Sequence, residues 1–133
     1  MIAVALSLFL GLGFSIGGYL KDETVTGYLP ADGPWYLTEL DGARVDTPIT
    51  LELTTGAITI QGPCLRLRAA QRAPYPWLKA TAIDTSDNTC PLSPAESAAR
   101  EYLSRVNVAE VSGDILVLSE TGGAEMVFRL SQP

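Results

Sequence analysis

The chain contains two cysteines, Cys64 and Cys90, which could form a disulfide, remain as thiols or carry redox chemistry. In an exported domain such a pair is typical of a structural disulfide, which would stabilise the fold by roughly 3.5 kcal/mol in the chain-entropy model. Two buried thiols in a cytosolic protein are the alternative, because cysteine also packs as a small hydrophobe. A redox-active pair is less favoured, since there is no C-x-x-C motif and Arg66 is the one basic residue close to either sulfur. We therefore predict a disulfide.

Acidic residues and serines near the second cysteine are the only group that suggests acid–base or nucleophilic catalysis. They are Asp84, Ser86, Asp87, Ser93 and Glu96. Turn chemistry explains the two aspartates, helix capping explains Glu96, and no serine stands in a nucleophile-elbow motif. A carboxylate pair would be catalytic if both groups shared a cleft and one had a raised pKa. We expect the chain not to be an enzyme, with a carboxylate-based enzyme as the alternative.

The absence of histidine from the chain further limits the kinds of catalytic and metal site that it could form. Histidine is the commonest general base and the commonest metal ligand, and two cysteines without it cannot make an ordinary zinc site. The formal net charge of −6 also argues against a nucleic-acid-binding protein, which would need a basic surface. We expect no metal, no cofactor and no nucleic-acid partner.

One stretch of the chain departs from this acidic balance. Between Cys64 and Ile83 every charged residue is basic, namely Arg66, Arg68, Arg72 and Lys79. A solvated face of a strand explains this charge simply, and a docking patch for a partner is the alternative. Arg66 and Arg68 are therefore candidate binding residues.

Two aromatic residues, Tyr75 and Trp77, lie in the same stretch and are separated by Pro76. Packing within a loop or against the core is the expected use of these rings. Because the segment is rich in proline and adjoins the basic residues, contact with a partner is the alternative. Tyr75 and Trp77 are therefore also candidate binding residues.

Residues 1–20 form an uncharged, apolar run that ends abruptly at Lys21, Asp22 and Glu23. Twenty helical residues span about 30 Å, which matches the hydrocarbon layer of a bilayer. We expect an uncleaved N-terminal membrane anchor, although a cleaved secretory signal is the alternative; a signal would normally carry a basic n-region and an A-x-A-like cleavage site. Lys21 by itself favours a cytoplasmic domain. The cysteines favour the opposite side, and we give them more weight.

Residues 21–33 carry turn signals and are expected to be a linker, so that the folded domain comprises residues 34–133. Within this domain apolar and polar residues alternate in short runs, as in half-buried strands. Strands are predicted at 35–40, 49–54, 58–61, 64–68, 78–83, 108–112, 115–119 and 125–130.

One helix is predicted directly after the second cysteine. Ser93 is a good N-cap, Pro94 suits the first helical position, and Glu96 stands where a capping-box carboxylate belongs. Apolar residues then recur at helical spacing up to Val106. Together these elements predict a mainly β (α+β) fold, a small antiparallel barrel or sandwich with one α-helix that closes an end or an edge, preceded by the N-terminal hydrophobic helix.

The order of these motifs resembles the META domain family, to which the bacterial heat-shock protein HslJ belongs. Residues 35–42 are similar to the opening W-x-L-x-x-x-x-G motif of the family, and the Gly62-Pro63-Cys64 and Thr89-Cys90-Pro91 triplets, the helix and residues 116–128 follow in the family's order. Two features depart from the family pattern: Pro63 intrudes before the first cysteine, and Leu65 replaces the usual asparagine after it.

The resemblance implies a cracked antiparallel β-barrel with one helix at the bacterial cell envelope. Its shape would be similar to that of secretion-system pilot proteins that hold lipid or peptide, and the family offers no established catalytic residue. We therefore expect a non-catalytic, membrane-tethered envelope domain that binds an envelope protein or an apolar ligand such as a lipid, with a stress-related role. It would be anchored in the inner membrane with a periplasmic domain, or be free in the periplasm if residues 1–20 are cleaved. A stability or assembly factor without a ligand site is the alternative.

Overall fold

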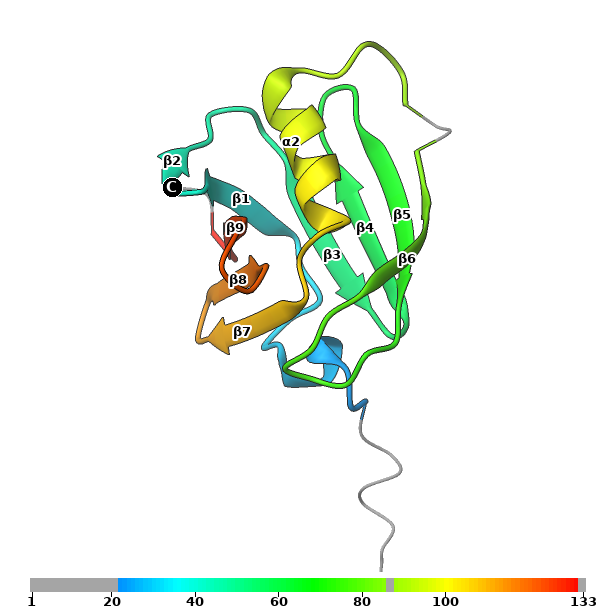
Figure 1. Ribbon diagram of the computed structural model, residues 1–133, viewed down its shortest axis with the longest axis vertical. Coiled ribbons are helices and arrows are strands. Elements are labelled where there is room, and N and C mark those ends of the chain that lie inside the picture. The colour runs from blue at the N-terminus through cyan, green and yellow to red at the C-terminus, as the bar shows by residue number, and fades with distance from the viewer. Residues whose placement is uncertain (1–21, 86–87, 132–133) are drawn as a thin grey trace, which may run out of the picture.

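The computed structural model describes residues 22–85 and 88–131, which form a curved antiparallel sheet with one α-helix and one short 3-10 helix (Figure 1). The helices are η1 (Val25–Tyr28) and α2 (Pro94–Leu103). The strands are β1 (Trp35–Leu40), β2 (Ala43–Arg44), β3 (Thr50–Thr54), β4 (Ala57–Gln61), β5 (Arg66–Gln71), β6 (Ala80–Asp84), β7 (Val108–Ser112), β8 (Ile115–Ser119) and β9 (Glu125–Arg129).

The sheet has the strand order β6-β5-β4-β3-β1-β9-β8-β7, with the short β2 paired to β1. It curls so that its two ends meet at one point, just before β6 and at the start of β7. There the Ala109 N–H donates to the Pro76 carbonyl over 2.7 Å, and the Leu78 N–H donates to the Asn107 carbonyl over 3.1 Å. The result is an antiparallel half-barrel with one helix, which confirms the predicted mainly β fold.

The alternation of apolar and polar residues explains why these strands form a single curved sheet. In β3, β4 and β5 every second side chain is buried, including Leu51, Leu53, Ile58, Ile60 and Leu67. Because successive side chains of a strand point to opposite faces, this pattern gives the sheet one apolar face, which becomes the interior of the half-barrel.

Helix α2 packs onto this interior and begins where the sequence predicts. Ser93 caps its first turn, and Pro94 is its first residue. Ala99 and Leu103 are fully buried in the same core as the strand residues, so the apolar stripe of the helix covers the concave side of the sheet.

The segment predicted to be a linker is packed against the half-barrel from residue 22 onward. Val25, in η1, is fully buried in the core, and the Thr26 hydroxyl donates to the Thr54 carbonyl. The Tyr75 N–H also donates to the Glu23 carbonyl over 2.8 Å. Turn residues are common in this segment, but its apolar residues pack against the half-barrel. From residue 22 onward the segment is therefore part of the folded domain and not a free tether.

The predicted N-terminal hydrophobic helix, residues 1–20, lies outside the described residues. Within residues 22–85 and 88–131, no helix has the length and apolar character needed to cross a bilayer.

Candidate functional site

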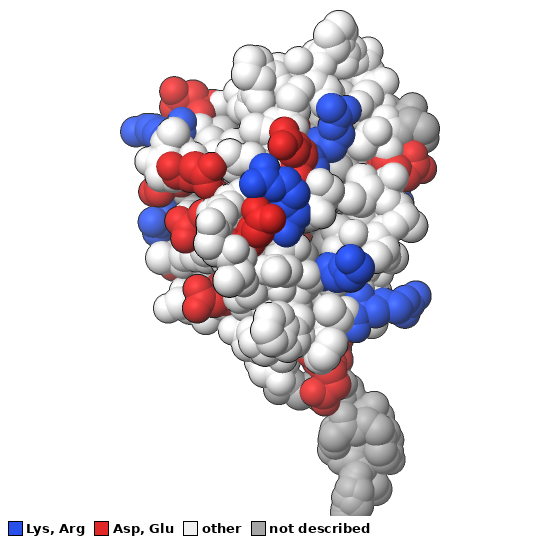
Figure 2. Space-filling model, viewed as in Figure 1, with Lys and Arg blue, Asp and Glu red and all other residues white. Residues whose placement is uncertain are grey.

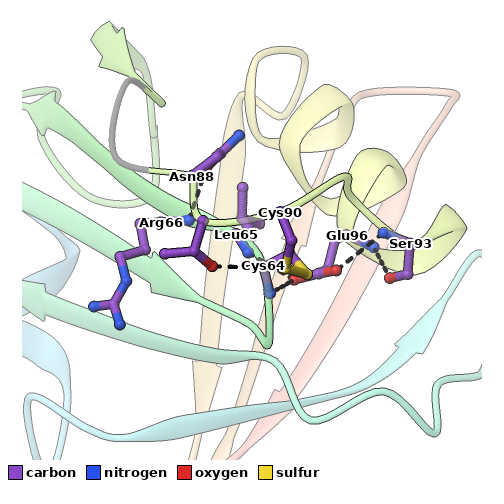
Figure 3. Close-up of a disulfide and its surroundings, with 8 residues drawn as sticks. Cys64, Leu65, Arg66, Asn88, Cys90, Ser93 and Glu96 are labelled. Atoms are coloured by element: carbon purple, nitrogen blue, oxygen red, sulfur yellow. Dashed lines mark hydrogen bonds between the residues drawn. A yellow bond between two sulfur atoms is a disulfide. The ribbon is translucent and has the colours of Figure 1, made fainter.

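Cys64 and Cys90 form the predicted disulfide, with their Cα atoms 4.9 Å apart (Figure 3). The bond joins the turn before β5 to the segment that leads into α2. A second connection runs beside it, since the Thr89 N–H donates to the Cys64 carbonyl over 3.1 Å. The disulfide therefore fixes the start of the helix to the start of a central strand.

The Glu96 carboxylate lies directly beneath this disulfide and is only 1% exposed (Figure 3). Its Oε2 atom accepts hydrogen bonds from the Cys64 and Leu65 N–H groups, each over 2.7 Å. Its Oε1 atom accepts from the Ser93 N–H over 3.0 Å, and the Ser93 hydroxyl accepts in turn from the Glu96 N–H. The predicted capping box is present, and the same carboxylate also holds the turn before β5.

These hydrogen bonds determine the ionisation of Glu96. Burial by itself would raise the pKa of this carboxyl group, but the Ser93, Cys64 and Leu65 N–H groups donate to the charged form and hold the pKa below its ordinary value of 4.5. A general acid needs the opposite shift. The arrangement therefore gives Glu96 a structural use as an anion bound by backbone amides.

The other carboxylates considered for catalysis are Asp84 and Asp87. Asp84 lies at the exposed end of β6, and Asp87 lies outside the described residues. The described residues also contain no cluster of three or more His, Cys, Asp or Glu side chains that could hold a metal ion.

Arg66 and Arg68 extend from the outer face of β5, and both are exposed. Arg68 stands opposite Asp84 of β6 and opposite Thr59 of β4. Together with Gln61 these residues line a hollow of about 210 Å³ on the outer face of β4, β5 and β6. The two arginines thus lie on the same face of β5, because alternate side chains of a strand point to the same side.

Tyr75 lies at the other end of β5 and is largely used in packing. Its ring stacks on that of Tyr28, with centroids 4.4 Å apart and an interplanar angle of 20°. Its hydroxyl oxygen accepts a hydrogen bond from the Val111 N–H over 3.2 Å. Tyr75 therefore connects η1 to β7.

Trp77, by contrast, has an exposed side chain on a fixed backbone. Its side chain is 55% exposed. Its backbone pairs with Val108 in an isolated bridge, between the hydrogen bonds that join Pro76 to Ala109 and Leu78 to Asn107.

The four predicted binding residues therefore lie in two places. Arg66 and Arg68 belong to the outer face near the disulfide, whereas Tyr75 and Trp77 belong to the opposite end of the half-barrel. We call this the η1 end, and it comprises η1, the turn at residues 55–56 and the loop at residues 72–79. Tyr28 also lies at this end and was not predicted as a site residue. The apolar residues of segment 25–29 are the sequence signal that this segment packs against the domain.

Comparison with known families identifies the domain. The META domain model matches residues 28–133 of the chain. The chain belongs to the META domain family. This confirms the resemblance predicted from the motifs, and the match begins six residues before the predicted domain start, within the segment that packs against the half-barrel.

Two solved structures share the fold of this META domain. A protein from Burkholderia xenovorans, solved by NMR, is similar with a TM-score of 0.61 at 15% identity over 98% of this chain and 100% of that chain. A DUF4847 family protein from Bacteroides vulgatus is similar with a TM-score of 0.59 at 12% identity over 80% of this chain and 97% of that chain. At these identities the likeness concerns the fold alone. No curated protein sequence matches the chain.

Proposed function

We propose that this META domain chain is a non-catalytic, membrane-tethered protein of the bacterial cell envelope that binds a protein partner along the edge strand β6. The exposure of β6 carries the proposal. The strand stands at the end of the sheet and pairs with β5 on one side. Four of its five residues are exposed, including the hydrophobic Ile83 at 36%.

An exposed edge strand offers backbone donors and acceptors to an extended segment of another protein. In β6 the regular pairing with β5 is interrupted, because the register shifts between Arg68 and Ala70 and Ala82 has a φ of 51°. Such a bulge limits nonspecific pairing of the edge strand with other chains. Ile83 and the hollow beside Arg66 and Arg68 then provide side-chain contacts that would select an apolar and acidic segment.

The interior of the half-barrel supports a protein partner over an apolar ligand. Every long strand except the exposed edge strand β6 contributes buried side chains to one core, among them the large Trp35 and Phe128, and α2 adds Leu103. A lipid held inside would have to displace these side chains. The outer surface is therefore the better place for recognition.

Two features support the placement at the envelope. Residues 1–20 have the length and apolar character of a membrane anchor. The Cys64–Cys90 disulfide is typical of proteins in an oxidising compartment such as the periplasm. We propose an inner-membrane anchor with a periplasmic domain, or a periplasmic protein if residues 1–20 are cleaved. The stress-related role stays a prediction from the family resemblance.

Photocrosslinking of the full chain in its own membranes tests the partner site. Ile83 is replaced by a photoreactive amino acid, and Glu125, exposed on the internal strand β9, is replaced in a matched control. We expect a discrete protein adduct from position 83 and none from position 125, and Ile83→Lys should weaken co-purification of the same protein. Equal adducts from both positions, or none from position 83, would refute the β6 site.

A further inference from the structure

We infer that the η1 end of the half-barrel rests on the bilayer surface, with Trp77 and Tyr28 seated in the interfacial layer of the lipid. This inference rests on the membrane tether in the proposed function. It adds a defined orientation of the domain and a lipid-contacting surface.

The apolar run and the folded domain are almost directly joined in the sequence. One residue, Lys21, separates residues 1–20 from Asp22. Asp22 already accepts hydrogen bonds from the N–H and hydroxyl groups of Thr24, at 2.8 and 2.6 Å, and Val25 is fully buried. Because one residue spans at most about 3.6 Å, an anchored chain would hold the η1 end within a few ångströms of the membrane.

The exposed aromatic residues lie at this same end of the half-barrel. The described residues include three exposed large hydrophobic side chains, and two of them, Trp77 at 55% and Tyr28 at 40%, lie at the η1 end. Figure 1 shows η1 at one end of the half-barrel, beside the loop that precedes β6. Tryptophan and tyrosine are the side chains that favour the membrane–water interface.

The Trp77 backbone and the Tyr28 ring are held in place before any contact with lipid. The backbone on both sides of Trp77 is hydrogen-bonded to Ala109 of β7 and to Asn107 just before it, and the ring of Tyr28 stacks on Tyr75. Because the backbone at Trp77 and the ring of Tyr28 are already ordered, binding to lipid costs less conformational entropy here than it would for a mobile loop.

The charges at this end indicate which force would dominate. Arg72 and Lys79 are exposed there, but Asp22 and Glu23 lie at the same end. Figure 2 likewise shows basic and acidic groups interspersed on the viewed face rather than one large basic patch. We therefore expect insertion of the aromatic rings to dominate over attraction to anionic lipid.

Tryptophan fluorescence of the full-length chain in phosphatidylcholine vesicles tests the inference, because the chain has two tryptophans and Trp35 is fully buried. The Trp77→Phe variant gives the Trp35 background, which is subtracted. We expect Trp77 emission to shift to shorter wavelength, to lose intensity when lipids brominated near the headgroup replace ordinary lipids, and to be protected from aqueous acrylamide. Added phosphatidylglycerol should change this little.

The alternative outcomes separate the inference from the proposed function. If the chain sediments with the vesicles but Trp77 is quenched by acrylamide and not by brominated lipid, the docking is wrong and the tether stands. If Trp77 is shielded from both quenchers, a protein surface or a second copy covers it, which also overturns lipid docking. If the chain does not sediment with vesicles, the tether itself fails, and the docking fails with it.

Discussion

At the residue scale, Glu96 is the most connected polar side chain of the candidate site. One carboxylate completes the capping box of α2 and binds the two backbone N–H groups that follow the turn at Gly62. The space beside it is tight, since a Cβ atom on Gly62 would lie 2.5 Å from Oε2. The start of β5, the disulfide and the helix therefore meet at one buried anion.

We predict that Glu96→Gln destabilises the domain by about 2 kcal/mol, because hydrogen bonds to a charged group are lost and the buried NH2 group of glutamine would face a backbone N–H donor instead of accepting from it. Glu101→Gln on the exposed side of α2 is the matched control and should change stability by no more than about 0.5 kcal/mol. Urea unfolding of the oxidised protein measures both. A Glu96→Gln variant as stable as the control would show that the buried anion contributes nothing.

The pKa shifts predict how stability depends on pH. The pKa of Glu96 is lowered, and so is that of Asp41, chiefly by the Tyr102 hydroxyl that donates to it over 2.6 Å. A lowered carboxyl pKa gives stability that is complete above the ordinary values of 3.8 and 4.5 and is lost as the pH falls through the folded-state pKa.

We therefore expect the free energy of unfolding to be level above about pH 5 and to decrease on further acidification, with a shallower decrease in Glu96→Gln. Denaturation midpoints measured across this range check the sign. A rise in stability on acidification would contradict the geometry around both carboxylates.

At the element scale, η1 changes what the N-terminal segment does. The segment is part of the folded domain, because Val25 enters the core and a backbone hydrogen bond joins residues 23 and 75. It also brings the ring of Tyr28 onto that of Tyr75, two residues before the exposed Trp77. The element that looked like a tether instead builds the end of the half-barrel.

We predict that Val25→Ala lowers the free energy of unfolding by about 1.5 kcal/mol, from the two buried carbon atoms it removes. Asp32→Ala, at an exposed side chain of the same segment, is the control and should have little effect. Thermal or urea unfolding distinguishes the two. Equal, negligible effects would mean that the segment is a free linker after all.

At the scale of the whole molecule, the two proposed surfaces are compatible with simultaneous use. β5 runs from the disulfide toward the η1 end, and β6 starts at Ala80, after Trp77, and returns antiparallel to it. An η1 end seated on lipid would therefore leave Ile83, near the far end of β6, directed away from the membrane. The membrane tether and the lipid contact would then lie at one end of the domain, and the partner site on β6 would lie farther from the membrane.

This arrangement predicts that the two surfaces are independent. Trp77→Phe should leave the adduct formed from position 83 unchanged, and Ile83→Lys should leave the quenching of Trp77 by brominated lipid unchanged. Loss of one signal on mutation of the other site would show that lipid and partner share a single surface.

The sequence by itself determined those features that depend on neighbours along the chain. Alternation of apolar and polar residues predicted eight of the nine strands, and the Ser93-to-Glu96 spacing predicted the cap of α2. The motif order predicted the META domain family, and the two cysteines predicted the disulfide. The missed strand, β2, has two residues, too few to show a period.

Only the tertiary structure decided which distant residues meet. Glu96 binds the backbone of Cys64 and Leu65, and Tyr28 of η1 stacks on Tyr75. The four predicted binding residues lie on two separate surfaces, the outer face of β5 and the η1 end. Local patterns specify which face of a strand or helix is apolar, but not its neighbour in the sheet. The strand order and the curl of the sheet decide those contacts, because the apolar faces are all satisfied together only when the half-barrel closes over one core.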